Sequence, residues 1–140
     1  MTNRKLADIV KCQRLLTLEQ HESVQQACRC MWECDAGTVL VVDGDQQLIG
    51  IFTGRDAVRT LAEGKSAKTT QLMHAMTPNP ITASPDSRAI DALREMNNHG
   101  FRHLPVVEEG RICGVVSRGD FMGMEIDRLD DEMHLWEFIR

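Results

Sequence analysis

The sequence predicts a mixed α+β fold that contains two copies of one structural unit. Short β-branched runs alternate with segments in which apolar residues recur at helical spacing, which is typical of mixed folds. Fourteen residues separate Thr17 from Met31, and fourteen also separate Thr82 from Met96. Because several such distances are kept, we interpret the two halves as repeats of about 65 residues.

The first repeat is expected at residues 1–63. Its helix after residue 23 carries Val24, Ala27, Cys28 and Met31 at the spacing of one buried stripe. The expected elements are a lead-in helix at 1–10, a strand at 15–18, this helix, strands at 38–42 and 48–53, and a helix that begins at 54–56.

Residues 64–71 are small and polar, so we expect a linker there, followed by the second repeat at 72–124. Ala89, Ala92, Leu93 and Met96 repeat the helical stripe. The expected elements are a helix at 72–76, a strand at 81–83, a turn and helix N-cap at 84–87, the striped helix, a hairpin at 104–116 and a helix after Ser117. A C-terminal helical extension is expected at 125–140.

Composition and charge narrow the class of protein. The formal net charge is −5, and seven acidic residues against two arginines lie between Asp120 and Arg140. This acidic end argues against a nucleic-acid backbone as the main partner. No apolar run approaches the roughly 20 residues of a membrane span, and the first residues lack the apolar core of a signal peptide. We therefore expect a cytoplasmic protein with no membrane partner.

The five cysteines suggest free thiols in a reducing compartment, since their number is odd. Cys28, Cys30 and Cys34 form a cluster, but only Cys30 and Cys34 share a face at helical pitch. No second pair with zinc-like spacing follows, so we predict no metal site.

A polar corner closes each repeat where a strand meets a helix. The two corners are Thr53-x-x-Asp56 and Ser117-x-x-Asp120, and in both the aspartate follows a glycine by six residues. A hydroxyl and a carboxylate at this spacing can cap the helix, or they can hold the hydroxyls of a small ligand. A small sheet with one apolar face is not stable alone, so we expect the repeats to face each other across a pseudo-twofold axis.

The sequence resembles the tandem cystathionine-β-synthase (CBS) domain pair, or Bateman module. The resemblance rests on two βαββα copies that end in Gly-h-h-(Thr/Ser)-x-x-Asp, where h is hydrophobic. Met76-Thr-Pro-Asn-Pro-Ile-Thr82, Ala92-Leu-Arg-Glu-Met96 and Leu104-Pro-Val-Val107 are similar to the family's second-repeat phrases. The resemblance implies a regulatory module that binds an adenosine-containing ligand (AMP, ADP, ATP or S-adenosylmethionine) in a cleft between the repeats.

The resemblance also assigns roles to residues of this chain. The aspartates would accept hydrogen bonds from ribose hydroxyls, the corner hydroxyls would contact ribose or phosphate, basic residues would neutralise phosphates, and strand-edge residues would face the base. These are Asp56 and Asp120; Thr53 and Ser117; Arg55, Arg102, His103 and Arg118; and Leu16, Thr17, Ile81 and Thr82. The first repeat has Gly37-Thr38 in place of Arg102-His103, and Leu15 in place of Pro80. We therefore expect the second repeat to hold the better site.

Two other functions compete with this hypothesis. Catalysis is not expected, because the five histidines are scattered and no nucleophile motif accompanies them. A ligand-free interaction or dimerisation module is the alternative, because Ile126, Leu129, Met133, Trp136 and Ile139 keep helical spacing in the extension. We predict a stand-alone, homodimeric CBS-pair sensor that requires no cofactor and signals to an unidentified effector protein.

Overall fold

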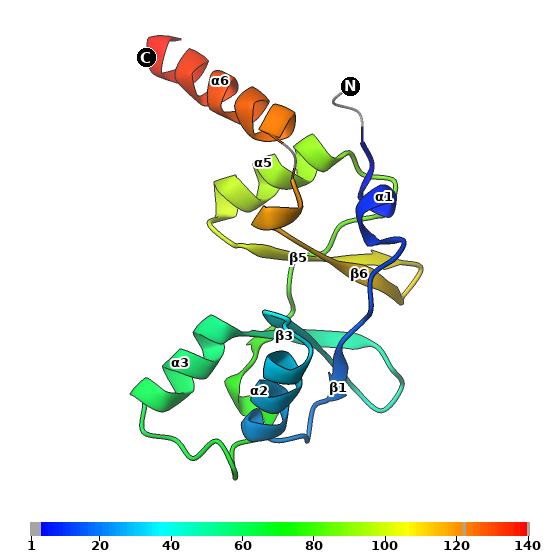
Figure 1. Cartoon of the computed structure of the whole chain (residues 1–140), viewed down its shortest axis with the longest axis vertical. Coiled ribbons are helices and arrows are strands. Elements are labelled where there is room, and N and C mark those ends of the chain that lie inside the picture. Colours follow the sequence, from blue (N-terminus) through cyan, green and yellow to red (C-terminus); the bar gives the residue numbers. More distant parts are fainter. Residues whose placement is uncertain (1–3, 122, 140) are drawn as a thin grey trace. The chain divides into compact units, whose positions relative to one another are not determined.

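A computed structural model describes residues 4–121 and 123–139 of the chain. Side chains are described up to residue 133, except that of residue 124. The chain forms two compact units. Unit 2 is the continuous segment Leu15–Pro80, and unit 1 combines the residues up to Arg14 with those from Ile81 onward. Figure 1 traces their helices and strands.

Unit 2 is built on a four-stranded sheet in the order β1-β2-β3-β4. Strand β2 pairs parallel with β1 and antiparallel with β3, and β3 pairs antiparallel with β4. The strands are β1 (Thr17–Glu19), β2 (Thr38–Val42), β3 (Leu48–Thr53) and β4 (Thr77–Pro78), and the helices are α2 (Val24–Glu33), α3 (Gly54–Ala62) and α4 (Leu72–Ala75). Every residue of β2 is buried, which explains its unbroken β-branched and apolar sequence.

Helix α2 follows the predicted stripe except at Cys28, which is only half-buried. Val24, Ala27 and Met31 are buried and pack in the core of unit 2 with Phe52 of β3. Ser23 caps the helix, because its Oγ accepts a hydrogen bond from the Gln26 N–H at 3.0 Å.

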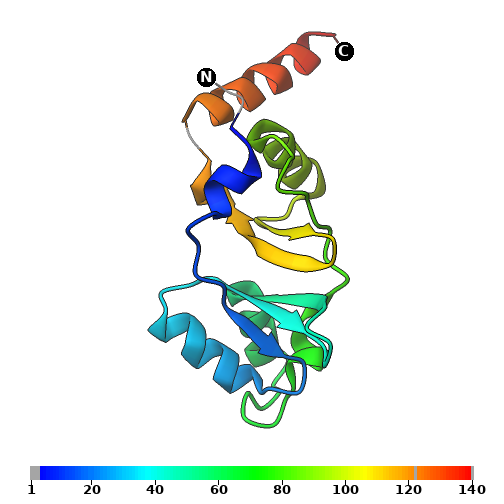
Figure 2. The ribbon, with the colours of Figure 1, turned by 90° about the vertical axis from the view of Figure 1, so that its right-hand side faces the viewer.

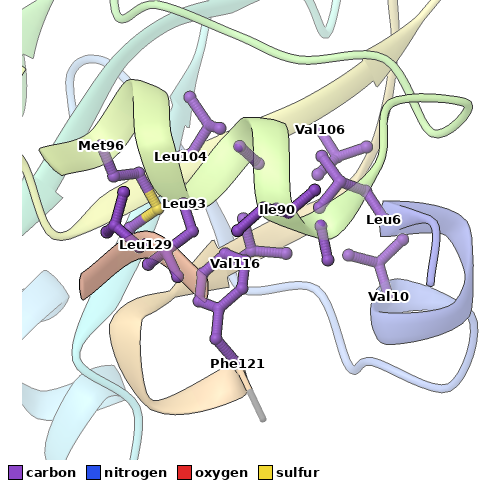
Figure 3. Close-up of a cluster of buried hydrophobic side chains, with 12 residues drawn as sticks. Leu6, Val10, Ile90, Leu93, Met96, Leu104, Val106, Val116, Phe121 and Leu129 are labelled. Atoms are coloured by element: carbon purple, nitrogen blue, oxygen red, sulfur yellow. The ribbon is translucent and has the colours of Figure 1, made fainter. Parts of the chain in front are cut away.

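Unit 1 contains the two-stranded hairpin of β5 and β6, which are antiparallel neighbours. Its elements are α1 (Leu6–Val10), α5 (Ala89–His99), β5 (His103–Glu108), β6 (Arg111–Ser117), the short 3-10 helix η1 (Arg118–Asp120) and α6 (Gly123–Ile139). In Figure 3, Leu93 and Met96 of α5 pack with Val116, Phe121 and Leu129 in the core of this unit.

The two lead-in helices are exchanged between the repeats. Helix α1 belongs to unit 1 and lies beside β6, as Figures 1 and 2 show, whereas α4 belongs to unit 2. In unit 1 the Leu6 N–H donates to the Ser87 carbonyl at 2.9 Å, and in unit 2 the Leu72 N–H donates to the Glu22 carbonyl at 2.8 Å. The expected repeats are continuous stretches of the chain, at 1–63 and 72–124 with a linker at 64–71. The compact units have other boundaries, because α1 is part of unit 1 and α4 is part of unit 2.

Three expected local structures are corrected. Residues 81–83 form no strand, although Ala83 makes an isolated parallel bridge to Val106. Helix α5 has no side-chain cap at its N-cap residue Arg88; instead the Arg4 carbonyl accepts the Ala89 N–H at 2.7 Å. The chain after Ser117 makes only the 3-10 helix η1 before α6 begins at Gly123.

The extension forms α6, which packs on α5 of its own unit. Leu129 is buried in the core of unit 1, and the Asn97 amide contacts the Met133 sulfur at 3.4 Å. This packing corresponds to a helix folded back on its own domain. The side chains of Trp136 and Ile139, which were expected to extend the apolar face of this helix, lie outside the described residues.

Candidate functional site

The corner of unit 1 holds the Asp120 carboxylate in a fixed orientation. Asp120 Oδ2 accepts hydrogen bonds from the Ser117 N–H at 2.7 Å and from Ser117 Oγ at 3.2 Å. This is the capping interaction expected from the motif. Among the described residues, no donor forms a hydrogen bond to Asp120 Oδ1. The corner is therefore capped and still presents one oriented carboxylate oxygen.

Basic residues lie on both sides of this corner in the hairpin. The Arg118 N–H donates to the Arg102 carbonyl at 3.2 Å, so the end of β6 is joined to the residue before β5. His103 is the strand partner of Ser117. The Arg102 and Arg118 side chains are exposed, while His103 is half-buried. The corner and the residue bonded to it thus carry two exposed guanidinium groups, and each can bind a phosphate or carboxylate through paired N–H donors.

A hollow of about 400 Å³ opens where α5 ends. Gly100 terminates the helix in the left-handed region at φ 72°, which a glycine adopts without strain. The hollow brings the half-buried ring of Phe101 together with two exposed arginines; it is lined by Met96, Asn97, Gly100, Phe101, Arg102 and Arg118. A flat aromatic base and an anionic group are the chemistry that such a lining suits.

The corner of unit 2 has the same motif but a different state. Asp56 is only 4% exposed. Its Oδ2 accepts from the Thr53 N–H at 2.9 Å and Oγ1 at 3.3 Å. Its Oδ1 accepts from Thr77 Oγ1 at 3.3 Å and pairs with the Arg59 guanidinium at 3.0 Å. Both carboxylate oxygens of Asp56 are bonded to residues of unit 2, so this corner stabilises the unit and leaves neither oxygen without a partner.

The residues that seal Asp56 were not anticipated from the sequence. Arg59 lies one helical turn after Asp56, so an i,i+3 ion pair could have been predicted from spacing alone. Thr77 lies 21 residues from Asp56 in the chain, and its approach requires β4 to pair with β3. Arg55, by contrast, is exposed at the start of α3.

None of the residues expected to face a base is fully buried. Leu16 and Thr17 are half-buried, and the Leu16 carbonyl accepts the Leu40 N–H at 3.0 Å. Ile81 is 46% exposed, and Thr82 is exposed beside the bridge residue Ala83. The expected site residues therefore fall into one group per unit, and the group of unit 2 lacks a counterpart of Arg102-His103. Unit 1 has Ile81, Thr82, Arg102, His103, Ser117, Arg118 and Asp120, and unit 2 has Leu16, Thr17, Thr53, Arg55 and Asp56.

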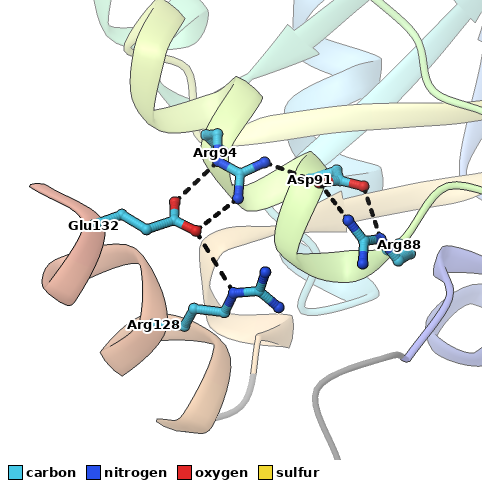
Figure 4. Close-up of polar contacts among 5 residues, drawn as sticks. All are labelled: Arg88, Asp91, Arg94, Arg128 and Glu132. Carbon is cyan, nitrogen blue, oxygen red and sulfur yellow. Dashed lines mark hydrogen bonds and ion pairs between the residues drawn. The ribbon is translucent and has the colours of Figure 1, made fainter.

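An ion-pair cluster joins α6 to α5 in unit 1 (Figure 4). Arg94 forms a bidentate pair with Glu132, with Nη2–Oε1 at 2.8 Å and Nε–Oε2 at 3.0 Å, and it also contacts Asp91 at 2.9 Å. The hydrogen bond from Arg94 lowers the pKa of Glu132, and the hydrogen bond from Arg88 lowers the pKa of Asp91. The cluster fixes α6 on its own unit by charge as well as by packing.

Among the described residues, no three His, Cys, Asp or Glu side chains gather as metal ligands. Burial raises the pKa of the Cys28 thiol, which opposes thiolate formation. Within the same residues, no helix is both long enough and apolar enough to cross a membrane.

The fold and its corners define a class: a tandem repeat of α+β units, each closed by a hydroxyl–aspartate corner. The chain belongs to the CBS domain family, whose model matches residues 6–63 and 71–126. The family match covers both repeats, so the chain is a tandem CBS domain pair.

Several known proteins with CBS domains are similar to the chain. It is 39% identical over 108 residues, 76% of the chain, to the CBS domain-containing protein CBSCBSPB2 of Arabidopsis thaliana. The chain spans 19% to 42% of the length of the first curated relatives that it matches. A solved protein with CBS domains from Burkholderia ambifaria, described as a candidate signal-transduction protein, is 32% identical with a TM-score of 0.77. That likeness covers 83% of this chain and 89% of that one.

A further solved structure was determined with ligands. The CBS domain pair of protein MJ0100, in complex with 5′-methylthioadenosine and S-adenosyl-L-methionine, is 25% identical with a TM-score of 0.76. The likeness covers 92% of this chain and 97% of that one.

Proposed function

We propose that this CBS pair is a non-catalytic sensor that binds an adenosine-containing ligand at the Ser117–Asp120 corner of unit 1. The observation that carries the proposal is the state of Asp120: its Oδ2 is fixed by Ser117, and its Oδ1 takes no hydrogen bond from the described residues. A carboxylate held in this way is oriented to accept hydrogen bonds from a ribose hydroxyl. The MJ0100 complex supports the proposed class of ligand, because both ligands in it contain adenosine.

The surroundings of Asp120 fit the rest of such a ligand. Arg102 and Arg118 would pair with a phosphate of AMP, ADP or ATP, or with the carboxylate of S-adenosylmethionine. Phe101, which is half-buried and lines the hollow, offers aromatic surface for a base. His103 and Thr82 lie in the same unit and would complete the contacts.

Unit 1 is the preferred site, because the corresponding carboxylate of unit 2 is already engaged. Asp56 would have to give up the Arg59 ion pair or the Thr77 hydrogen bond before it could bind a ribose. Binding there would therefore be weaker. We propose that the ligand state is passed to an effector protein, with the CBS pair acting as a homodimer.

A thermal-shift screen followed by calorimetry tests the proposal. AMP, ADP, ATP and S-adenosylmethionine are added at millimolar concentration, and a true ligand should raise the Tm by mass action. Asp120→Asn keeps an acceptor for the Ser117 N–H but loses the charge, so we expect affinity to fall at least about tenfold. Asp56→Asn is the matched control and should leave affinity unchanged. Equal losses from both substitutions would contradict the preference for unit 1.

A ligand-free interaction module is the second candidate. It is favoured by three large apolar side chains that are exposed on the helices of unit 2: Trp32 at 86%, Val58 at 65% and Leu61 at 70%. Exposed groups of this kind are common at protein interfaces. If no adenosine compound raises the Tm, while light scattering shows a dimer that Trp32→Ser dissociates, this function replaces the sensor.

A further inference from the structure

Arg4 connects three parts of unit 1 that are distant in the sequence. Its carbonyl accepts the Ala89 N–H at the start of α5. Its guanidinium Nη2 donates to the Asp120 carbonyl at 2.8 Å and to Glu125 Oε1 at 2.9 Å, while Nε donates to Glu125 Oε2 at 3.4 Å. One side chain therefore holds both the backbone of the candidate ligand corner and the first turn of α6.

The pairing of Arg4 with Glu125 is enclosed by the protein. Glu125 is 2% exposed, and the side chain of Arg4 is 22% exposed. A buried carboxylate needs a cation and hydrogen bonds, and removing one partner of such a pair is strongly destabilising. The carboxylate also lies in the first turn of α6, where negative charge is favoured by the helix dipole. Arg4 and the start of α6 are thus bound in one fixed geometry.

The backbone of the corner depends on the same guanidinium. The segment Arg118–Asp120 is a single 3-10 turn, and its closing hydrogen bond from the Phe121 N–H to the Arg118 carbonyl is long, at 3.4 Å. The bond from Arg4 to the Asp120 carbonyl, at 2.8 Å, is shorter and charge-assisted. Arg4 therefore holds the Asp120 carbonyl, and with it the backbone of the turn, from outside, while Ser117 holds the Asp120 carboxylate.

We propose that Arg4 is a positioning residue that couples the Ser117–Asp120 corner to helix α6. Ligand bound at the corner and the docked position of α6 then stabilise each other, because both need the same guanidinium geometry. The ligand half of this inference rests on the proposed sensor function. Coupling of this kind is reciprocal, so loosening α6 must weaken ligand binding by the same factor that ligand binding tightens α6.

Hydrogen exchange followed by mass spectrometry tests the coupling without any ligand. Arg4→Met removes the guanidinium but keeps an unbranched side chain, and we expect faster exchange in residues 117–121 and 123–133. Arg88→Met is the matched control, since Arg88 is half-exposed and its side chain pairs with Asp91 on α5. The control should leave the corner unchanged, and β5 should keep its protection in both variants, which a general loss of stability would not allow.

A second variant covers the case in which Arg4→Met fails to fold. Arg4→Met combined with Glu125→Met removes both charges, so no buried carboxylate is left without its cation, and such exchanges are often tolerated. The double variant should fold with the same fast exchange at the corner. Wild-type exchange at residues 117–121 in whichever variant folds would overturn the proposal.

Calorimetry with an adenosine ligand from the screen tests the other half. We expect Arg4→Met to bind roughly 5- to 10-fold more weakly than wild type, and Arg88→Met to bind as wild type does. Unchanged affinity in Arg4→Met would overturn the coupling. If the wild-type protein binds none of the ligands, the sensor function fails on its own, and the exchange comparison alone decides whether Arg4 joins the corner to α6.

Discussion

Replacing Leu6 by alanine should destabilise unit 1, which contains most of the second repeat. Leu6 lies in α1 near the N-terminus, and its side chain is fully buried in the core of unit 1, whose other members are residues 83 and beyond apart from neighbours in α1. In Figure 3 it lies with Val10 beside Val106. A substitution at residue 6 is therefore expected to act on strands that begin about a hundred residues later.

The size of the effect follows from the burial of the side chain. A buried Leu→Ala change costs about 2–5 kcal/mol, through lost transfer energy and the cavity that remains. Helix α1 has only five residues and can shift to fill part of the cavity, so we expect about 3 kcal/mol. At about 1.4 kcal/mol for each factor of ten, the protection of unit 1 amides should fall roughly 150-fold.

Hydrogen exchange resolved by segment measures this effect. Peptides from β5 and β6 should lose protection in Leu6→Ala, while peptides from β2 and β3 should keep it. Leu72→Ala is the matched control, because Leu72 is equally buried in unit 2 and should give the reverse pattern. Loss of protection in β2 and β3 from Leu6→Ala would refute the exchange of lead-in helices.

Two more predictions concern packing and pH. In Gly114→Ala the new Cβ would lie 2.7 Å from Val10 Cβ, an atom fixed to the backbone, so urea unfolding should show the free energy of unfolding lowered by about 1–3 kcal/mol. Gly119→Ala is the control, because nothing lies within 4 Å of its new Cβ, and it should lower this free energy hardly at all. Equal losses from the two substitutions would contradict this reasoning. The hydrogen bond from Arg94 holds the pKa of Glu132 below its ordinary value, so their contact stabilises α6 at neutral pH and is lost as the pH falls below about 4. Because both side chains are about a third exposed, the loss should be about 0.5 kcal/mol, seen by NMR titration of α6 amides and absent in Glu132→Gln.

The repeat and its family could be predicted from the sequence because they depend on local patterns. Spacing alone placed the stripes of α2 and α5, and the structure confirms that Val24, Ala27 and Met31 are buried. The hairpin was expected from its apolar runs, and β5 and β6 confirm it. The capping hydrogen bonds between Ser117 and Asp120 were also predicted, because they follow from the spacing of these two polar residues.

What the sequence could not provide depends on contacts between distant segments. The apolar face of α1 indicates that Leu6 is buried, but it does not say against which sheet. The cap of α5 was expected from a local side chain, whereas the Arg4 carbonyl supplies it from 85 residues away. The two aspartates look equivalent in the motif, yet Thr77 seals Asp56 through pairing of β4 with β3, and that pairing leaves no local signal.

The discontinuous make-up of unit 1 has a consequence for the order of events during synthesis on the ribosome. Residues 15–80 are contiguous, so unit 2 has all of its parts once they have emerged. Helix α1 is made before unit 2, but its apolar face is buried by residues of α5, β5 and β6, which are made much later. The earliest segment of the described chain must therefore wait, with Leu6 and Val10 uncovered, until the second half arrives. An isolated fragment of residues 15–80 should fold alone, whereas one that ends near residue 63 should not.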